Sequence, residues 1–222
     1  MKTKINLPTK ITIARIVLAT LLIVAVAVLY VVDQFNPFIY KTNIILNDSG
    51  AFINYVMIII FAIFLFASLT DFLDGHIARK YNMVTDLGKF LDPIADKMLV
   101  NAMSIFLALN FSSLQNHLQF PFFLVVIMTT RDLIVDGVRL MAAKKSIVIS
   151  ANIFGKAKTV LQMVAISLVF LNGFPFSYFD FGWPTYLHIT DIFCYLATIV
   201  SIISGVIYLI QNKSVFGGKE NE

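Results

Sequence analysis

Six long apolar runs place the strongest constraint on what this chain can fold into. Each has roughly the 20 residues that an α-helix needs to cross a bilayer; the runs are Ile11–Val32, Ala51–Thr70, Phe90–Asn110, Phe120–Ala142, Ile153–Leu171 and Tyr186–Ile210. Because little chain is left between them, residues 1–222 are predicted to form a single all-α integral membrane domain with six transmembrane helices. Basic and apolar residues alternate in the stretch Met1–Ile13, which predicts a short interfacial segment on the membrane surface.

The distribution of basic residues predicts how this domain is oriented. Of the 222 residues, 59% are hydrophobic and 14% are charged, which excludes an ordinary soluble domain. If both termini lie in the cytoplasm, Lys41 faces the outside and every other Lys and Arg faces the cytoplasm, as the positive-inside rule requires. The prediction is a multi-pass protein of the cytoplasmic membrane with a polar cavity open to the cytoplasm. Its basic excess attracts anionic lipid rather than nucleic acid.

Cysteine and histidine offer no metal site in this pattern. Cys194 is the single cysteine, and His76, His117 and His188 are scattered, so neither an internal disulfide nor a Cys/His site is expected. Cys194 falls in the last apolar run and is expected to pack in the core.

Four aspartates stand where the second apolar run ends and the third begins. Asp71 and Asp74 are three residues apart, and Asp92 and Asp96 are four apart, so each pair shares one face of a helix. If the two helices are antiparallel neighbours, the pairs converge at one membrane surface, where four carboxylates repel one another unless cations lie between them. Oxygen ligands favour Mg²⁺ or Mn²⁺, and four carboxylates leave room for two ions. The alternative is that these aspartates are helix caps or solvated end groups.

The residues around these aspartates narrow the interpretation. The stretch matches the pattern D-x2-D-G-x2-A-R-x8-G-x3-D-x3-D at every position; its non-acidic positions are Gly75, Ala78, Arg79 and Gly88. Small residues let a diphosphate approach the backbone, and a guanidinium can bind phosphate with two parallel hydrogen bonds. We refer to residues 71–96 as the acidic signature.

The acidic signature resembles that of the CDP-alcohol phosphotransferase family, membrane enzymes that make phospholipids. The resemblance implies that CDP-diacylglycerol is the donor, with its diphosphate gripped by the metal ions that the four aspartates hold. It assigns CDP binding to Asp71, Gly75, Ala78 and Arg79, and the role of base to Asp96. The alternative is that Arg79 only fixes the orientation of the helix, as a basic residue on the cytoplasmic side of the membrane.

A second group of charges lies in the fourth apolar run. Arg131, Asp132, Asp136 and Arg139 stand at helix-face spacings, so two interpretations are open. Arg131 can pair with Asp132 or Asp136, and Arg139 with Asp136. Alternatively the charges are functional, because burying a charged group within a membrane costs free energy and such groups usually serve a function.

The region from Arg131 to Gln162 predicts the acceptor. This region, which includes Gly155, Lys156 and Lys158, resembles a pattern of the bacterial phosphatidylglycerophosphate synthases within that family. The pattern is R-E-x4-G-x-R followed by G-K-x-K-T-x2-Q, and this chain has Asp132 where Glu is common. This implies a bacterial enzyme that uses glycerol 3-phosphate; its phosphate would bind the basic side chains of Arg131, Arg139 and Lys156.

Other functions stay open at this point. Within the family the alternatives are transfer to inositol phosphate and cardiolipin synthesis. A cation transporter is a different class, disfavoured because the carboxylates cluster at one membrane face and no paired broken helices indicate inverted repeats. The sequence also leaves a homodimer open.

Overall fold

The computed structural model describes most of the chain. It covers residues 7–36, 43–45, 52–80, 86–111, 117–145, 153–179 and 188–215. Within these ranges the side chains at positions 7, 8, 43, 45, 71–80, 86–90, 92, 93, 178 and 214 lie outside the description.

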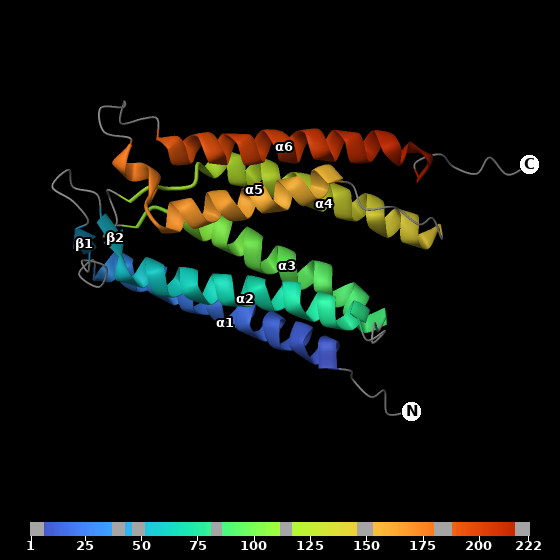
Figure 1. Cartoon of the computed structure of the whole chain (residues 1–222), viewed down its shortest axis with the longest axis horizontal. Coiled ribbons are helices and arrows are strands. Elements are labelled where there is room, and N and C mark those ends of the chain that lie inside the picture. Colours follow the sequence, from blue (N-terminus) through green and yellow to red (C-terminus); the bar gives the residue numbers. More distant parts are fainter. Residues whose placement is uncertain are drawn as a thin grey trace, which may run out of the picture.

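The described residues form six long helices, as the apolar runs predict. They are α1 (Leu7–Phe35), α2 (Tyr55–Lys80), α3 (Asp86–Leu107), α4 (Phe122–Lys144), α5 (Ile153–Phe170) and α6 (Ile189–Gln211), with short 3₁₀ turns η1 (Phe176–Tyr178) and η2 (Lys213–Val215). The helices alternate in direction, so α1 begins and α6 ends at the same end of the bundle (Figure 1). The ends of α2 and α4 and the starts of α3 and α5 lie there too.

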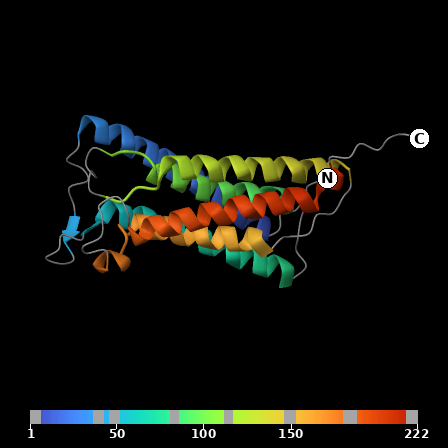
Figure 2. The same ribbon diagram turned by 90° about the horizontal axis from the view of Figure 1, so that it is seen from above.

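The helices pack as two groups that α3 joins. Helix α1 packs against α2 and α3, while α6 packs against α4 and α5. Helix α3 also contacts α2, α4 and α5, so it lies between the two groups (Figures 1 and 2). Side chains on α3 can therefore reach both the acidic signature and the second group of charges.

The loop before α2 contains structure that the sequence did not predict. Strand β1 (Asn43–Ile45) pairs antiparallel with β2 (Phe52–Asn54), with Ile44 opposite Ile53. The second membrane helix was expected to begin at Ala51, but α2 begins at Tyr55. The Oδ1 atom of Asn54 accepts a hydrogen bond from the backbone N–H of Val56 at 2.9 Å, the typical bond of a residue that caps a helix start.

The start of α1 also differs from expectation. Residues 7–13 were predicted to be part of a separate interfacial segment, but α1 is continuous from Leu7. Thr9, Thr12 and Arg15 are buried, with Arg15 only 2% exposed. These polar side chains face other helices rather than the membrane surface, so the described part of this segment belongs to the bundle.

Among the described residues, three helices are long and apolar enough to cross a bilayer: Thr9–Phe35 within α1, then α5 and α6. The apolar part of α2, Tyr55–Thr70, is shorter. Helices α3 and α4 are interrupted by the charges of the two motifs. On α1 the exposed residues include Val17, Leu21, Val24 and Val28, whose spacing of three or four residues makes an apolar stripe. An exposed apolar stripe of this length is typical of a helix that faces lipid, and the chain is a helical membrane protein.

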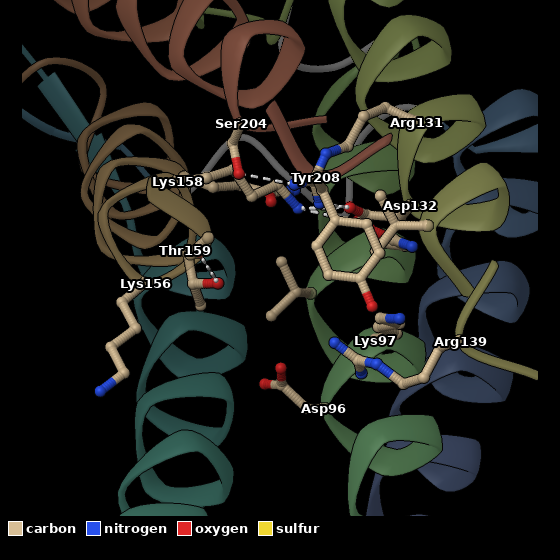
Figure 3. Close-up of a pocket in the computed structure, with 15 residues that line it drawn as sticks. Asp96, Lys97, Arg131, Asp132, Arg139, Lys156, Lys158, Thr159, Ser204 and Tyr208 are labelled. Atoms are coloured by element: carbon tan, nitrogen blue, oxygen red, sulfur yellow. Dashed lines mark hydrogen bonds and ion pairs between the residues drawn. The ribbon is translucent and has the colours of Figure 1, made fainter. Parts of the chain in front are cut away.

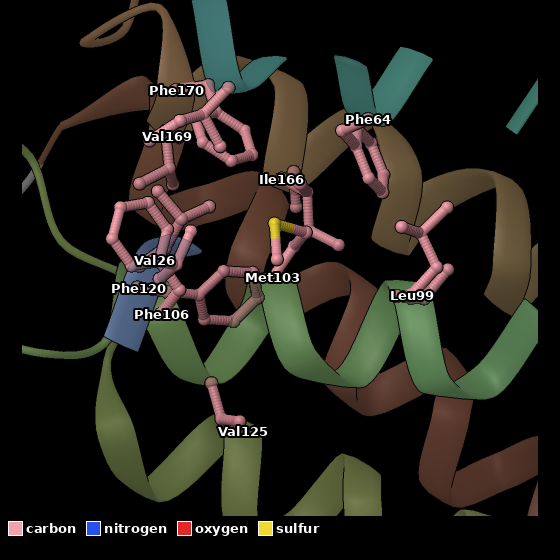
Figure 4. Close-up of a cluster of buried hydrophobic side chains, with 14 of the residues drawn as sticks. Val26, Phe64, Leu99, Met103, Phe106, Phe120, Val125, Ile166, Val169 and Phe170 are labelled. Carbon is pink, nitrogen blue, oxygen red and sulfur yellow. The ribbon is translucent and has the colours of Figure 1, made fainter. Parts of the chain in front are cut away.

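Buried apolar side chains, several of them aromatic, pack together between the helices (Figure 4). The ring of Phe170 on α5 lies 6.1 Å from that of Phe64 on α2 and 6.1 Å from that of Phe106 on α3, measured between centroids. All three side chains are buried. Because lipid is as apolar as these residues, close packing rather than exclusion from water holds membrane helices together.

We expect Phe170→Ala to lower the free energy of unfolding by roughly 3–5 kcal/mol, because it leaves a cavity between α2, α3 and α5. Thermal unfolding of the purified protein in detergent measures the change. Phe179→Ala is the matched control, since that side chain is 70% exposed and its loss should change the midpoint little. Equal effects of the two substitutions would contradict this account of the core.

Candidate active site

A cavity of about 260 Å³ lies between α3, α4, α5 and α6. Its polar and charged lining is Asp96, Lys97, Asn101, Arg131, Asp132, Arg139, Lys156, Lys158, Thr159, Gln162, Ser204 and Tyr208 (Figure 3). Five of these side chains are basic and two are carboxylates. The residues come from the start of α3 and α5 and the end of α4 and α6, so the cavity lies toward the end of the bundle where the acidic signature is.

The centre of the cavity wall is a buried carboxylate that holds two cations. Both oxygens of Asp132 contact the Lys158 Nζ atom, at 2.7 and 3.0 Å, and Arg131 Nη1 donates to Asp132 Oδ1 at 3.0 Å. Asp132 is 4% exposed and Lys158 is 6% exposed. The pairing of Arg131 with Asp132 confirms one of the two interpretations of the sequence. Lys158 was not predicted as a site residue, although it belongs to the motif quoted for this region. We call Arg131, Asp132 and Lys158 the ion triad.

Two serines of α6 accept further hydrogen bonds from the Arg131 guanidinium. The Nη2 atom donates to Ser204 Oγ at 2.7 Å and the Nε atom donates to the Ser201 carbonyl at 3.1 Å. A Cβ atom at Gly205 would lie 2.9 Å from Arg131 Cγ, closer than real side chains approach. Small residues on α6 therefore let the guanidinium lie against this helix, and nothing in the charge pattern of the sequence indicated their role.

A second ion pair joins α3 to α4. The Lys97 Nζ atom contacts Asp136 Oδ1, and both side chains are partly exposed. The alternative in which Arg139 pairs with Asp136 was wrong, because α3 brings Lys97 to Asp136 instead. Arg139 and Lys156, which are exposed at the cavity, have no ion-pair partner within the part of the chain that the structure describes.

Of the residues predicted for the donor site, only Asp96 has a side chain that the structure describes. Asp96 lines the cavity and is partly buried. The side chains of the other predicted residues, Asp71, Asp74, Gly75, Ala78, Arg79, Gly88 and Asp92, lie outside the described ones. Their backbone is helical, and the residues 81–85 that join α2 to α3 are few. Both pairs of aspartates are therefore on helix ends that lie at the same end of the bundle (Figure 1).

Comparison with known proteins identifies the family. A family model described as CDP-alcohol phosphatidyltransferase matches residues 5–203, which includes both motifs. The chain belongs to the CDP-alcohol phosphatidyltransferase family. The match ends before Ser204 and Tyr208, so these two cavity-lining residues of α6 lie beyond the matched region.

Relatives in several bacteria are similar over most of their length. The chain is 34% identical over 210 residues to the CDP-diacylglycerol–glycerol-3-phosphate 3-phosphatidyltransferase of Bacillus subtilis (strain 168), covering 93% of this chain and 95% of the relative. It is 33% identical over 218 residues to the protein of the same name in Rickettsia bellii (strain RML369-C), covering 97% and 100%. A third protein of that name, in Mycoplasma genitalium, is 40% identical over 156 residues, covering 67% of this chain and 61% of the relative.

We expect Asp132→Asn to destabilise the protein by roughly 3–5 kcal/mol, because it leaves the buried Lys158 ammonium without its compensating charge. Denaturant or thermal unfolding in detergent measures this loss. Asp136→Asn is the control: it removes a carboxylate on the same helix whose ion pair is partly exposed, and such pairs contribute about 0–1 kcal/mol. A loss as large in the control would show that burial of the ion triad is not what matters.

Proposed function

We propose that this protein transfers the phosphatidyl group of CDP-diacylglycerol to glycerol 3-phosphate and releases CMP. The observation that carries the proposal is the cavity lined by Asp96 together with Arg139 and Lys156, two cations without acidic partners among the described residues. In Figure 3 the Arg139 guanidinium lies toward Asp96, while the Lys156 side chain extends away from them. Two cations that no described carboxylate neutralises suit a phosphate dianion, and a carboxylate nearby suits a base for a hydroxyl. The names of the relatives favour glycerol 3-phosphate over inositol phosphate or phosphatidylglycerol.

The size of the cavity supports its assignment to the acceptor. At about 260 Å³ it is smaller than the ~300–1,000 Å³ that is usual for drug-sized ligands. A three-carbon phosphate suits this space, whereas a lipid with two acyl chains does not. The acyl chains of the donor would instead lie along the apolar outer surface of the helices.

The donor site is proposed at the acidic signature. Asp71, Asp74, Asp92 and Asp96 would hold Mg²⁺ or Mn²⁺, with room for two ions, because four carboxylate groups offer only oxygen ligands. Their spacing, and the placement of both pairs at one end of the bundle, support this. Such ions neutralise charge on a diphosphate.

Other residues of the acidic signature would bind the rest of the donor. Arg79 would add positive charge beside the diphosphate, and Gly75 and Ala78 would allow the CDP group to approach α2 closely, as the family resemblance implies.

The proposed reaction forms one bond to phosphorus and breaks another. The primary hydroxyl oxygen of the acceptor attacks the phosphorus that carries diacylglycerol, and the bond between that phosphorus and the CMP oxygen breaks. CMP leaves with the electron pair of the broken bond, and Asp96 accepts the hydroxyl proton. Arg139 and Lys156, with Arg131, would bind the acceptor phosphate so that this hydroxyl points toward Asp96.

The membrane arrangement proposed with this function has six crossings. All six helices would span the cytoplasmic membrane of a bacterium, with both termini and the cavity on the cytoplasmic side. The even number of alternating helices supports this, as does the presence of the cavity and its five basic side chains at the end where α1 begins and α6 ends. Glycerol 3-phosphate would then reach the cavity from the cytoplasm, and CDP-diacylglycerol would reach it from the inner leaflet of the membrane.

Metal dependence is tested by CMP release from CDP-diacylglycerol and glycerol 3-phosphate. Excess chelator should stop the reaction, and Mg²⁺ or Mn²⁺ should restore it. Asp96→Asn should lower kcat by roughly 10²–10⁴-fold through loss of the base, while Asp191→Asn, at the opposite end of the bundle, should leave it unchanged. Full activity in metal-free buffer would refute the metal site.

The acceptor site is tested by Arg139→Ala. Loss of a charge-assisted hydrogen bond costs roughly 1.5–3 kcal/mol, so the KM for glycerol 3-phosphate should rise about ten- to a hundredfold while the KM for the donor changes little. Lys144→Ala is the control, because it removes an exposed basic residue from the same helix outside the cavity. If Arg139→Ala weakens donor and acceptor equally, the phosphate site lies elsewhere.

A further inference from the structure

Tyr208 brings to the cavity a hydroxyl group that none of the contacts proposed above uses. Its side chain lines the cavity and is 5% exposed, and its Oη atom has no hydrogen-bond partner among the described residues. Leaving a buried hydroxyl without a partner costs free energy. Because this hydroxyl lies at a cavity assigned to the acceptor, the acceptor can supply the missing partner.

Packing determines where the Tyr208 ring lies. The side chain belongs to a buried apolar cluster with Val135 and Val138 of α4 and Val215 of η2. Val135 stands four residues before Arg139, on the same face of α4, and both residues line the cavity. The ring therefore packs beside the part of α4 that carries Arg139.

The Tyr208 hydroxyl is directed toward basic groups. Figure 3 shows it pointing toward the side chains of Lys97 and Arg139. Ammonium and guanidinium groups are donors only, so neither can accept the phenol proton. The Lys97 ammonium is held by Asp136, whereas Arg139 has no acidic partner among the described residues. Tyr208 and Arg139 are thus two donors that face one space and require an acceptor there.

An anion with several oxygen atoms satisfies both donors at once. One phosphate oxygen can accept from the Arg139 guanidinium while another accepts from the Tyr208 hydroxyl. A neutral hydroxyl of the ligand would satisfy Tyr208 but would leave the charge of Arg139 without compensation. Arg139 is exposed, so its guanidinium can turn toward a bound anion and uncover the buried hydroxyl.

We propose that Tyr208 donates a hydrogen bond to the phosphate group of the acceptor, beside Arg139. This inference rests on the proposed function and adds to its phosphate site a residue of α6 that lies beyond the stretch matched by the family model. The phosphate is then held from two helices, α4 and α6, which restricts its orientation more than contact with one helix does.

Tyr208→Phe tests this contact, because it removes the hydroxyl and keeps the packed ring. CMP release by the full-length protein in detergent gives the KM of each substrate. The KM for glycerol 3-phosphate should rise about tenfold, while kcat and the KM for CDP-diacylglycerol change by less than about twofold. Tyr195→Phe is the matched control, since that side chain lies on the same helix, is 41% exposed and should leave all three constants unchanged.

Inorganic phosphate separates the phosphate contact from contacts to the rest of the acceptor. It should compete with glycerol 3-phosphate, and its inhibition constant should rise by the same factor of about ten in Tyr208→Phe, while the inhibition constant of CMP stays unchanged. An unchanged inhibition constant for phosphate, equal changes in the KM of donor and acceptor, or loss of all activity in Tyr208→Phe would overturn the role of Tyr208 and leave the proposed function standing. No CMP release by the wild type with glycerol 3-phosphate would overturn both.

Discussion

The buried carboxylate of Asp132 is the interaction on which the arrangement of the site depends. A charge within the membrane is expensive unless it is paired, and Asp132 is paired twice, with Lys158 from α5 and Arg131 from its own helix. Arg131 extends the connection to α6 through Ser201 and Ser204. One acidic group therefore ties together the three helices that form most of the cavity wall.

This pairing separates the basic residues into two sets with different roles. Arg131 and Lys158 share the single negative charge of Asp132, so the ion triad keeps one positive charge and the positions of both cations are restricted. Lys97 is held by Asp136. Arg139 and Lys156 keep their full charge at the exposed side of the cavity, without acidic partners among the described residues. In the proposed reaction Asp132 and Lys158 shape the site, and Arg139 and Lys156 act with Arg131 to attract and bind the acceptor phosphate.

Helix α3 connects the two halves of the proposed chemistry. It carries Asp92 and Asp96 of the acidic signature near its start, and it contacts α2 on one side and α4 and α5 on the other. Asp96 and Lys97 are adjacent in sequence, and both line the cavity. A single rigid helix thus relates the proposed metal site to the acceptor cavity, because a shift of α3 would move both together.

The sequence by itself determined the number of helices and the pattern of the acidic signature. A bilayer requires each crossing segment to satisfy its own backbone hydrogen bonds, so apolar runs of this length predict helices before any tertiary contact is known. The motif spacings also identified the family. The sequence could not determine which partner each charge takes, because Arg131, Asp132, Asp136 and Arg139 lie close enough along one helix for several pairings. Only the tertiary structure decided among them, by bringing Lys97 on α3 to Asp136 and Lys158 on α5 to Asp132. It also added Ser204 and Tyr208 to the cavity wall and placed Gly205 against Arg131, since neutral and small residues carry no charge signal and gain their role from the helix they lie against.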